Sequence, residues 1–334
     1  MNFGMWAKAL RTIPWITKDE WDGLDIISRW LIASRAGVLI ITFISAGLAG
    51  LFAYRAGQFN LGLWLLMALG LLLSHATNNL LNDLTDYSRG VDGDNYYRAQ
   101  YGPHTLAHGL LTRRQLMAYI AVTGLLALVI GLYLVSLRGL PALVLLALGA
   151  FFVLFYTWPL KYIGLGEVAV LVVWGPLMIG GGYYIVTGAW DWNVTLAGLP
   201  YAIGAASIIF GKHIDKIVGD QAKHIHTLPV ILGERLARAA VVAMFALQYL
   251  VVIYLVLTRF FSPVLLIVLL ALPMLRTAVR AYRQPKPAAP PPDYPAQGWP
   301  LWFVGFSFIH NRRFGLLFML GLIGDVVLRA LHLV

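Results

Sequence analysis

The sequence predicts an all-α, polytopic membrane protein with about nine transmembrane helices. Of its 334 residues, 60% are hydrophobic and only 12% are charged, and the mean hydropathy is +0.75. Soluble domains carry about 25% charged residues. The apolar residues gather in repeated runs that approach the roughly 20 residues needed to cross a bilayer. Low charge and span-length runs together exclude an ordinary soluble domain.

Nine apolar runs are candidate spans. Most are nearly uninterrupted stretches of aliphatic and aromatic residues, whereas the fourth, sixth and eighth are shorter or carry polar residues. In chain order, the predicted spans lie near residues 36–54, 61–81, 116–137, 140–158, 165–187, 194–211, 237–258, 262–281 and 314–333.

Two segments outside these runs differ in composition. Residues 1–27 lack the basic start and apolar stretch of a signal peptide, and we interpret them as an interfacial, partly helical segment. Residues 284–300, QPKPAAPPPDYPAQGWP, contain too much proline for a helix and predict an exposed linker. We expect one membrane domain over residues 1–334 and no soluble domain.

Lys and Arg are distributed unevenly between alternate connections. One side of the predicted topology holds 21 of these residues and the other holds 4, which together account for all 25. Because cytoplasmic loops carry an excess of basic residues, this ratio predicts a cytoplasmic N-terminus and an odd number of spans. We expect a multi-pass protein of the inner (plasma) membrane whose two long polar loops both face the cytoplasm.

The net charge of +10 and the absence of cysteine limit the possible functions. Because no dense basic tract with interleaved aromatic residues is present, we expect no nucleic-acid partner. A lipid bilayer with anionic headgroups, or an anionic substrate, is the expected partner. Without cysteine the chain has no disulfide, thiolate metal site or thiol nucleophile.

A first acidic segment follows the second predicted span. It reads NNLLNDLTDYSRGVD and places Asn79, Asp83 and Asp86 at i, i+4 and i+7, which is one face of a helix. Mg²⁺ prefers oxygen ligands and is usually held by one or two carboxylates together with substrate phosphates. This pattern therefore predicts a site for a divalent cation and a diphosphate.

A second acidic segment follows the sixth predicted span, on the same predicted face. It reads GKHIDKIVGDQAKHIHTLPVILGE (211–234) and offers Asp215 and Asp220 among three lysines. Ordinary solvated loop charges are the alternative interpretation of either segment alone. Two such clusters, each at the end of a span, favour a functional site.

Several stretches resemble one known family. NDLTD (82–86), extended by Gly90 and Asp92, is similar to the first aspartate-rich motif of the UbiA superfamily of intramembrane prenyltransferases. YGPHTLAHGLLTRRQL (101–116) and YTWPLKYIGLGEVAVLVVWGPLMIGGGYYIVTG (156–188) resemble the branch that prenylates 1,4-dihydroxy-2-naphthoate for menaquinone. The resemblance covers most of the chain. It implies nine helices around a central cavity, with two aspartate-rich cytoplasmic loops that bind prenyl diphosphate through Mg²⁺.

The resemblance also implies roles for individual residues. The expected Mg²⁺ ligands are Asp83, Asp86, Asp92, Asp215 and Asp220. The expected catalytic residues are Asp83, Asp86, Lys216, Asp220, Tyr156 and Lys161, the last two flanking the isoprenoid or the diphosphate. The expected contacts to the diphosphate are Arg35, Asn79, Asn82, Arg89, Lys212 and Lys223.

The second motif departs from the family pattern. The family places two carboxylates four residues apart, whereas here Lys216 holds the earlier position and Asp215 lies beside it. On an ideal helix, a spacing of five turns Asp215 and Asp220 about 140° apart. Either the helix is distorted there, or Asp220 binds metal while Lys216 contacts a phosphate oxygen directly.

Four further sites have open interpretations. Arg35 is a topology anchor or a phosphate contact, and Glu167 could orient an acceptor hydroxyl or pair with a nearby lysine. Ionisable residues inside spans are functional candidates, but Asp325 is expected to form an interhelical hydrogen bond. HNRRF (310–314) precedes the last predicted span and is interpreted as a cytoplasmic anchor.

The expected function is Mg²⁺-dependent transfer of a polyprenyl group from prenyl diphosphate to an aromatic acceptor, with 1,4-dihydroxy-2-naphthoate as the expected acceptor. Metal, Lys and Arg would stabilise the leaving diphosphate, and an aromatic-lined cavity would shelter the allylic cation. A terpene cyclase, a prenyltransferase with another lipid acceptor and a cation-coupled transporter are the alternatives. Transporters usually place their ionisable sites near the bilayer midplane, so acids at helix ends favour an enzyme.

Overall fold

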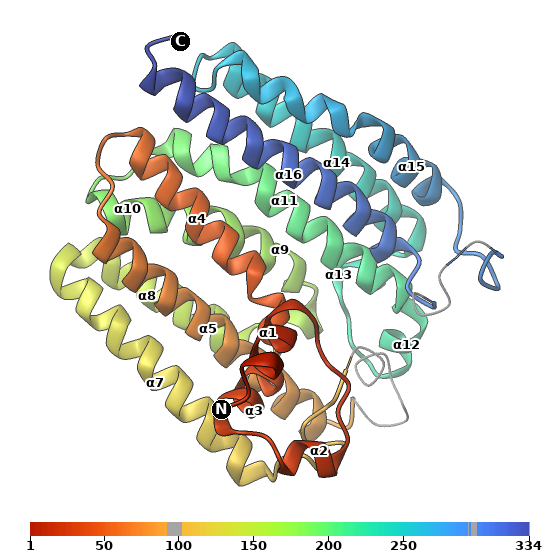
Figure 1. Ribbon diagram of the computed structural model, residues 1–334. Coiled ribbons are helices and arrows are strands. Elements are labelled where there is room, and N and C mark those ends of the chain that lie inside the picture. Colours follow the sequence, from red (N-terminus) through yellow and green to blue (C-terminus); the bar gives the residue numbers. More distant parts are fainter. Residues whose placement is uncertain (92–101, 293, 295–298, 334) are drawn as a thin grey trace. The chain divides into compact units, whose positions relative to one another are not determined.

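The computed structural model describes the whole chain except residues 92–101, 293, 295–298 and 334 (Figure 1). The described residues form helices, and no strand occurs among them. They divide into two compact units. The segments are Met1–Ala53, Gln58–Pro159 and Tyr184–Ala189 for unit 1, and Tyr54–Gly57, Leu160–Tyr183 and Trp190–Val334 for unit 2. The single membrane domain expected from the sequence stays a prediction.

Unit 1 contains the N-terminal helices and the first long apolar helices. The last two residues of α4 belong to unit 2. In chain order the helices are α1 (Phe3–Arg11), α2 (Lys18–Asp22), α3 (Ile26–Ala33), the 3-10 helix η1 (Ala36–Val38), α4 (Ile40–Arg55), α5 (Leu61–Ser88), α7 (Arg113–Arg138) and α8 (Leu140–Phe155).

Unit 2 contains the remaining helices, although the end of α10 lies in unit 1. In chain order they are the 3-10 helix η2 (Leu160–Ile163), α9 (Gly166–Val172), the π-helix η3 (Val173–Gly181), α10 (Gly182–Thr187), α11 (Trp192–Asp215), α12 (Ile217–Ala222), α13 (Leu228–Leu232), α14 (Glu234–Leu257), the 3-10 helix η4 (Pro263–Ala271), α15 (Leu272–Arg283) and α16 (Phe303–Ala330).

Within the described chain, seven helical segments are long and apolar enough to cross a membrane. They are Ala36–Arg55, Leu61–Ser88, Arg113–Arg138, Gly166–Thr187, Trp192–Asp215, Glu234–Leu257 and Pro263–Arg283. The two other predicted spans fall on α8, a shorter apolar helix, and on α16, which has 28 residues and four charged side chains. Each predicted span thus corresponds to a helix, and the all-α, polytopic fold class is confirmed.

The last helix begins earlier than the sequence predicted. HNRRF (310–314), interpreted above as an anchor outside the span, lies inside α16. His310 is fully buried beside Phe245, and its Nε2 atom shares a hydrogen bond with the Tyr249 hydroxyl. Asn311 donates to Ser207 of α11 at 2.8 Å. The anchor interpretation is wrong for these two residues because their side chains pack inside unit 2.

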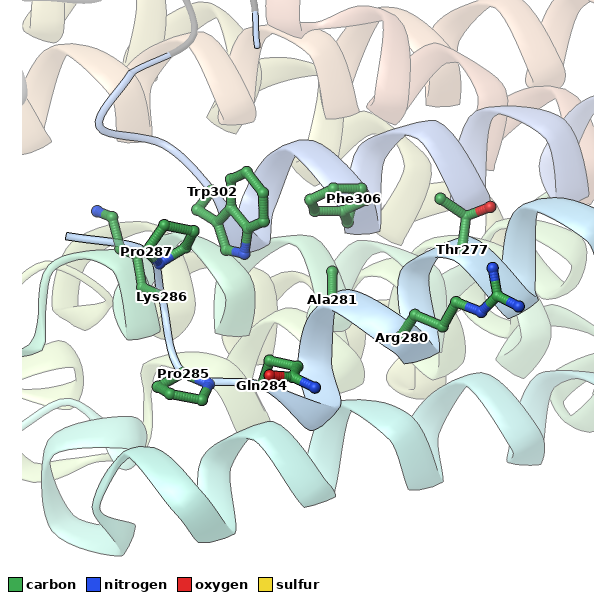
Figure 2. A pocket seen from close by; sticks show the side chains of 9 residues that line it. All are labelled: Thr277, Arg280, Ala281, Gln284, Pro285, Lys286, Pro287, Trp302 and Phe306. Atoms are coloured by element: carbon green, nitrogen blue, oxygen red, sulfur yellow. The ribbon is translucent and has the colours of Figure 1, made fainter. Parts of the chain in front are cut away.

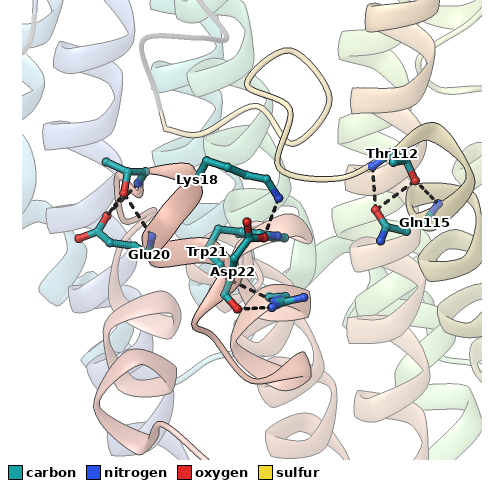
Figure 3. Close-up of polar contacts among 8 residues, drawn as sticks. Lys18, Glu20, Trp21, Asp22, Thr112 and Gln115 are labelled. Carbon is teal, nitrogen blue, oxygen red and sulfur yellow. Dashed lines mark hydrogen bonds and ion pairs between the residues drawn. The ribbon is translucent and has the colours of Figure 1, made fainter.

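The N-terminal segment folds into short helices against α5 and α7 within unit 1. Thr17 and Glu20 form a capping box at the start of α2, and Thr112 and Gln115 form another at the start of α7 (Figure 3). Each box satisfies backbone N–H groups that the helix itself leaves open. Trp21 is 1% exposed and fills the cluster that joins this segment to α5 and α7. The partly helical character predicted for residues 1–27 is confirmed.

In unit 2, η3 and α11 approach each other closely through glycines. A Cβ built on Gly180 would lie 2.6 Å from Oγ1 of Thr195, and one on Gly198 would lie 3.0 Å from the Ile179 side chain. Small residues at helix interfaces allow this approach in membranes, where packing replaces the hydrophobic effect as the driving force. The interface fixes α11, whose C-terminal end carries the second acidic motif.

Candidate functional site

The first acidic motif occupies the last turns of α5. Asn79, Asp83 and Asp86 all lie on this helix and are buried, at 7%, 1% and 7% exposure. The prediction that they share one helical face is confirmed by this common burial. A buried carboxylate loses its hydration and needs a charged or hydrogen-bonding partner.

Arg35 supplies that partner from the turn between α3 and η1. Its backbone is left-handed, with φ 57° and ψ 51°, which costs a non-glycine residue roughly 1–2 kcal/mol. Its Nη2 atom lies 3.2 Å from Oδ1 of Asp83 and donates to the Asn79 carbonyl at 2.8 Å. The same atom donates to Oδ1 of Asn82 at 3.3 Å. These contacts make Arg35 part of the first motif. A residue that served only as a topology anchor would not need them.

The two asparagines tie the motif to neighbouring segments of unit 1. Asn79 donates from Nδ2 to the carbonyl of Ser34, next to Arg35, at 2.9 Å. Asn82 donates from Nδ2 to Oδ2 of Asp86 at 3.3 Å and to the Thr157 hydroxyl at 3.1 Å. The amides thus hold the carboxylates in place at the end of α5.

Other predicted residues lie around the end of α8 and beyond. The Arg89 guanidinium stacks over the ring of Trp158, 4.6 Å from its centroid, within unit 1. Tyr156 caps the C-terminus of α8 and is half-buried. Lys161 belongs to η2 in unit 2, where its Nζ lies 5.5 Å from the ring centroid of Tyr162. Asp92 lies outside the described residues.

The second acidic motif lies at a helix break. Helix α11 ends at Asp215, Lys216 adopts φ −109° and ψ 2°, and α12 begins at Ile217. The distortion considered from the sequence is therefore present, and ideal helical geometry does not relate Asp215 to Asp220. The two carboxylates have different partners as a result.

Asp215 binds the start of α16. Its Oδ1 accepts the backbone N–H of Phe303 and its Oδ2 accepts that of Val304, both at 3.0 Å. Lys286 lies 3.9 Å from the same carboxylate. Burial lowers the pKa of Lys286, and the nearby carboxylates of Asp215 and Glu234 oppose that change. Asp215 thus acts as a cap for α16, where open N–H groups favour a negative charge.

Asp220 and the three lysines of the motif remain close to the break. The Oδ1 atom of buried Asp220 lies 3.5 Å from Nζ of Lys216, one turn earlier. Lys212 lies in the last turn of α11, and Lys223 caps α12 with its backbone N–H. The twelve residues from Lys212 to Lys223 therefore hold three lysines and two carboxylates, of which Asp215 is engaged by α16.

A buried pair that the sequence did not predict joins three segments of unit 2. Nδ1 of His213 lies 2.5 Å from Oε1 of Glu167, and both side chains are at most 5% exposed. Oε2 of Glu167 accepts the backbone N–H of Leu228 at 3.3 Å. Glu167 therefore pairs with a histidine of the second motif rather than with a lysine. Forty-six residues separate the two, so only the tertiary structure reveals the contact.

Asp325 makes the interhelical contacts expected of it. This fully buried carboxylate accepts the backbone N–H of Ser262 at 2.7 Å. It also pairs with Arg55 at 3.2 Å and with Arg329 at 3.1 Å. Two cations and one N–H satisfy the buried charge, so it needs no functional explanation.

The donor set fits Mg²⁺ that is bound together with a substrate. Among the described residues, no group of three or more His, Asp or Glu side chains gathers to form a complete metal site. Mg²⁺ usually takes only one or two carboxylates from a protein and completes its shell with phosphate oxygens and water. Asp83 and Asp86, three residues apart on the buried face of α5, provide such a pair.

Comparison with known proteins decides the family. A family model for the UbiA prenyltransferase family matches residues 42–306, which is most of the chain. The chain belongs to this family. A solved relative of this UbiA protein, the apo UbiA homolog from Aeropyrum pernix K1, covers 85% of this chain and 97% of its own. Its TM-score is 0.60 at 20% identity, which supports the same fold.

Two curated relatives carry names that specify an acceptor. The 2-carboxy-1,4-naphthoquinone phytyltransferase of Synechocystis is 29% identical over 62% of this chain and 67% of its own length. The 1,4-dihydroxy-2-naphthoate octaprenyltransferase of Bacillus subtilis is 27% identical over 75% of this chain and 81% of its own. The predicted family and prenyltransferase class are confirmed, as is the multi-pass membrane architecture. The transporter alternative finds no support in these matches.

Proposed function

We propose that this UbiA protein transfers a polyprenyl group from prenyl diphosphate to 1,4-dihydroxy-2-naphthoate, a step of menaquinone biosynthesis, in a Mg²⁺-dependent reaction. The observation that carries the proposal is the buried arrangement of Asp83, Asp86 and Arg35 at the end of α5. Carboxylates held this way favour a hard cation, and a guanidinium beside them favours phosphate oxygens.

In this proposal, Asp83 and Asp86 hold Mg²⁺, and Asp92 is a further candidate ligand. Bound Mg²⁺ would neutralise charge on the departing diphosphate. Arg35 orients Asp83 by direct pairing, while Asn79 and Asn82 fix the local geometry through the hydrogen bonds described above. Because these partners are in place in the folded chain, the carboxylates require little reorganisation when charge develops.

The second motif contributes Asp220 as a ligand and its lysines as phosphate contacts. Lys216 lies 3.5 Å from Asp220. If Asp220 binds Mg²⁺, Lys216 would contact an oxygen of the diphosphate bound to the same ion. Lys212 and Lys223 add positive charge near the same break. Asp215 is not included among the ligands, because both of its oxygens accept backbone N–H groups of α16.

Arg89, Tyr156 and Lys161 stay candidates for contacts with the donor. A tyrosine ring offers a π face to an allylic cation, and a lysine or arginine offers charge to the diphosphate. We further propose that the protein lies in the inner (plasma) membrane with its N-terminus and both acidic segments in the cytoplasm. The uneven distribution of Lys and Arg supports that orientation.

The names of the two relatives support this acceptor, since both specify a naphthoquinone or dihydroxynaphthoate compound. Such an acceptor is an anionic fused bicycle. Its carboxylate would repel a diphosphate in a low-dielectric site unless basic groups intervene. We expect basic residues of the loops, such as Arg89, Lys161 and Lys212, to supply that charge.

The test is a product assay with purified protein in lipid nanodiscs. With Mg²⁺ and a long-chain prenyl diphosphate, mass spectrometry should find prenylated 1,4-dihydroxy-2-naphthoate, and much less product from 4-hydroxybenzoate. Omitting Mg²⁺ should abolish both diphosphate release and product. Release of diphosphate with neither acceptor prenylated would contradict the proposal and would favour a terpene cyclase.

A further inference from the structure

A cavity of about 570 Å³ lies between the end of α15, the segment that follows it and the start of α16, entirely within unit 2. Figure 2 shows Trp302 and Phe306 on one side and Arg280, Ala281 and Gln284 on the other. The volume lies within the range typical of small-molecule sites. The aspartate motifs contribute no side chain to its wall, so the prenyl transfer proposed above does not account for it.

Exposed arginines lie on α15 beside the cavity, and one of them, Arg280, lines it. Arg276, Arg280 and Arg283 lie at i, i+4 and i+7 of α15 and are exposed. No hydrogen bond or ion pair engages these three side chains among the described residues. The sequence holds no Asp or Glu between residues 235 and 292. The face of α15 beside the cavity therefore carries a net positive charge.

The rest of the lining suits an amphiphile at a bilayer surface. The cavity lies where the apolar segment Pro263–Arg283 ends, the depth at which lipid headgroups meet water. Trp302 and Phe306 give it an apolar wall, and tryptophan is enriched at this depth. The indole N–H of Trp302 is covered and has no hydrogen-bond partner among the described residues. A buried donor without an acceptor is unfavourable, and a phosphate oxygen would satisfy it.

We propose that this cavity binds the headgroup of an anionic glycerophospholipid. The phosphate is held between Arg280 and Lys286 and accepts the N–H of Trp302. Basic pockets between transmembrane helices on the cytoplasmic side suit such headgroups. The acyl chains lie along exposed apolar side chains of η4, which leads into α15, and of α16, such as Leu270 at 61% and Phe308 at 55% exposure.

Lys286 connects this cavity to the second motif. It lines the cavity, donates to the Pro300 carbonyl and pairs with Asp215, which caps α16. A bound phosphate would share this ammonium with Asp215 and would hold the segment after α15 against the start of α16. Lipid binding should therefore stabilise unit 2 against thermal unfolding.

The experiment compares two lipids with identical acyl chains, anionic dioleoylphosphatidylglycerol and zwitterionic dioleoylphosphatidylcholine. Purified full-length protein in detergent is titrated with each, and bound lipid is counted by native mass spectrometry alongside the melting temperature. The anionic lipid should bind more tightly and raise the melting temperature by several degrees. Equal binding of the two lipids by the wild type would overturn the proposal.

Three variants locate the site. Arg280→Gln should weaken binding of the anionic lipid about fivefold, the effect expected from one cation near a membrane surface. Trp302→Phe, which keeps an aromatic ring in the wall but removes the indole N–H, should also weaken it. Arg114→Gln, at an exposed arginine at the start of α7, is the matched control and should bind normally. Equal losses in Arg280→Gln and Arg114→Gln would overturn the assignment to this cavity.

Inorganic phosphate distinguishes the lipid from a soluble anion. If millimolar phosphate displaces little of the anionic lipid, the acyl chains contribute and the lipid assignment stands. Stabilisation by inorganic phosphate that the anionic lipid cannot increase, and that Arg280→Gln removes, would overturn it.

Discussion

In the first acidic motif Asp83 and Asp86 lie on one continuous helix of 28 residues, whereas in the second Asp215 and Asp220 lie on either side of a break at Lys216. The carboxylates of the first motif contact side chains of the motif itself, Arg35 and Asn82. In the second motif, Asp215 is engaged by the backbone of another helix. Two acidic segments that look alike in sequence therefore provide different numbers of available carboxylates.

The difference has a simple physical cause. The start of a helix leaves N–H groups without partners, and a nearby carboxylate satisfies them. Asp215 lies beside such a start, that of α16, whereas Asp83 and Asp86 lie on the side of their own helix. The predictions below test whether this division separates metal binding from structural support.

The largest effect is expected from Asp83→Asn. Because the substitution keeps the shape and removes the charge, it should lower kcat/KM for the prenyl donor by about 10²–10³-fold, the usual cost of losing an electrostatic stabiliser. The assay is release of diphosphate at saturating Mg²⁺. Asp22→Asn, at an exposed aspartate of α2 paired with Lys18, is the control and should retain activity.

The second motif should show a split between its two aspartates. Asp220→Ala should raise the Mg²⁺ concentration needed for half-maximal activity by tenfold or more. Asp215→Asn should leave that concentration unchanged and instead lower the free energy of unfolding by about 1–3 kcal/mol, since it weakens charged hydrogen bonds to α16. Equal shifts in the Mg²⁺ requirement would mean that both aspartates bind metal.

A smaller, purely structural effect is expected from Gly211→Ala, one turn before Asp215. The added Cβ would lie 2.5 Å from the Tyr282 hydroxyl and 3.0 Å from backbone atoms of Phe303 and Val304. Such overpacking costs about 1–3 kcal/mol. Thermal or denaturant unfolding measures it. Gly47→Ala in α4, where nothing lies within 4 Å of the new Cβ, should be neutral or stabilising.

The smallest effect is expected from Glu167→Gln. The amide oxygen can still accept the Leu228 N–H, so the main change is to the hydrogen bond between Glu167 and Nδ1 of His213, at a cost of roughly 1 kcal/mol. The melting temperature should fall slightly while the KM for the acceptor stays the same. An acceptor KM that rises without a change in stability would instead show that Glu167 contacts the acceptor.

The helices could be predicted from the sequence because apolar runs and the 3.6-residue period are local. The shared face of Asn79, Asp83 and Asp86 is a case in which such a pattern was sufficient. The partners of Asp83 and Asp215 were not predictable in this way. Arg35 is 48 residues from Asp83, and the N–H groups of Phe303 and Val304 are 88 and 89 residues from Asp215.

The pattern of hydrophobicity also failed to predict where the last helix begins. HNRRF looked like an anchor because its charges flank an apolar run, yet His310 and Asn311 face other polar side chains inside unit 2. The amino-acid type of a polar residue does not reveal whether its side chain lies in a buried network or in a loop. Only the packing of the neighbouring helices distinguishes the two cases.

The most direct test of the central claim is Mg²⁺-dependent binding of a nonhydrolysable prenyl diphosphate, measured by calorimetry on the wild type, Asp83→Asn and Asp215→Asn. We expect the wild type and Asp215→Asn to bind the analogue only with Mg²⁺ and with similar affinity. Asp83→Asn should bind it at least tenfold more weakly. Equal weakening in both variants, or wild-type binding that does not change when Mg²⁺ is removed, would contradict the assignment of metal binding to the first motif.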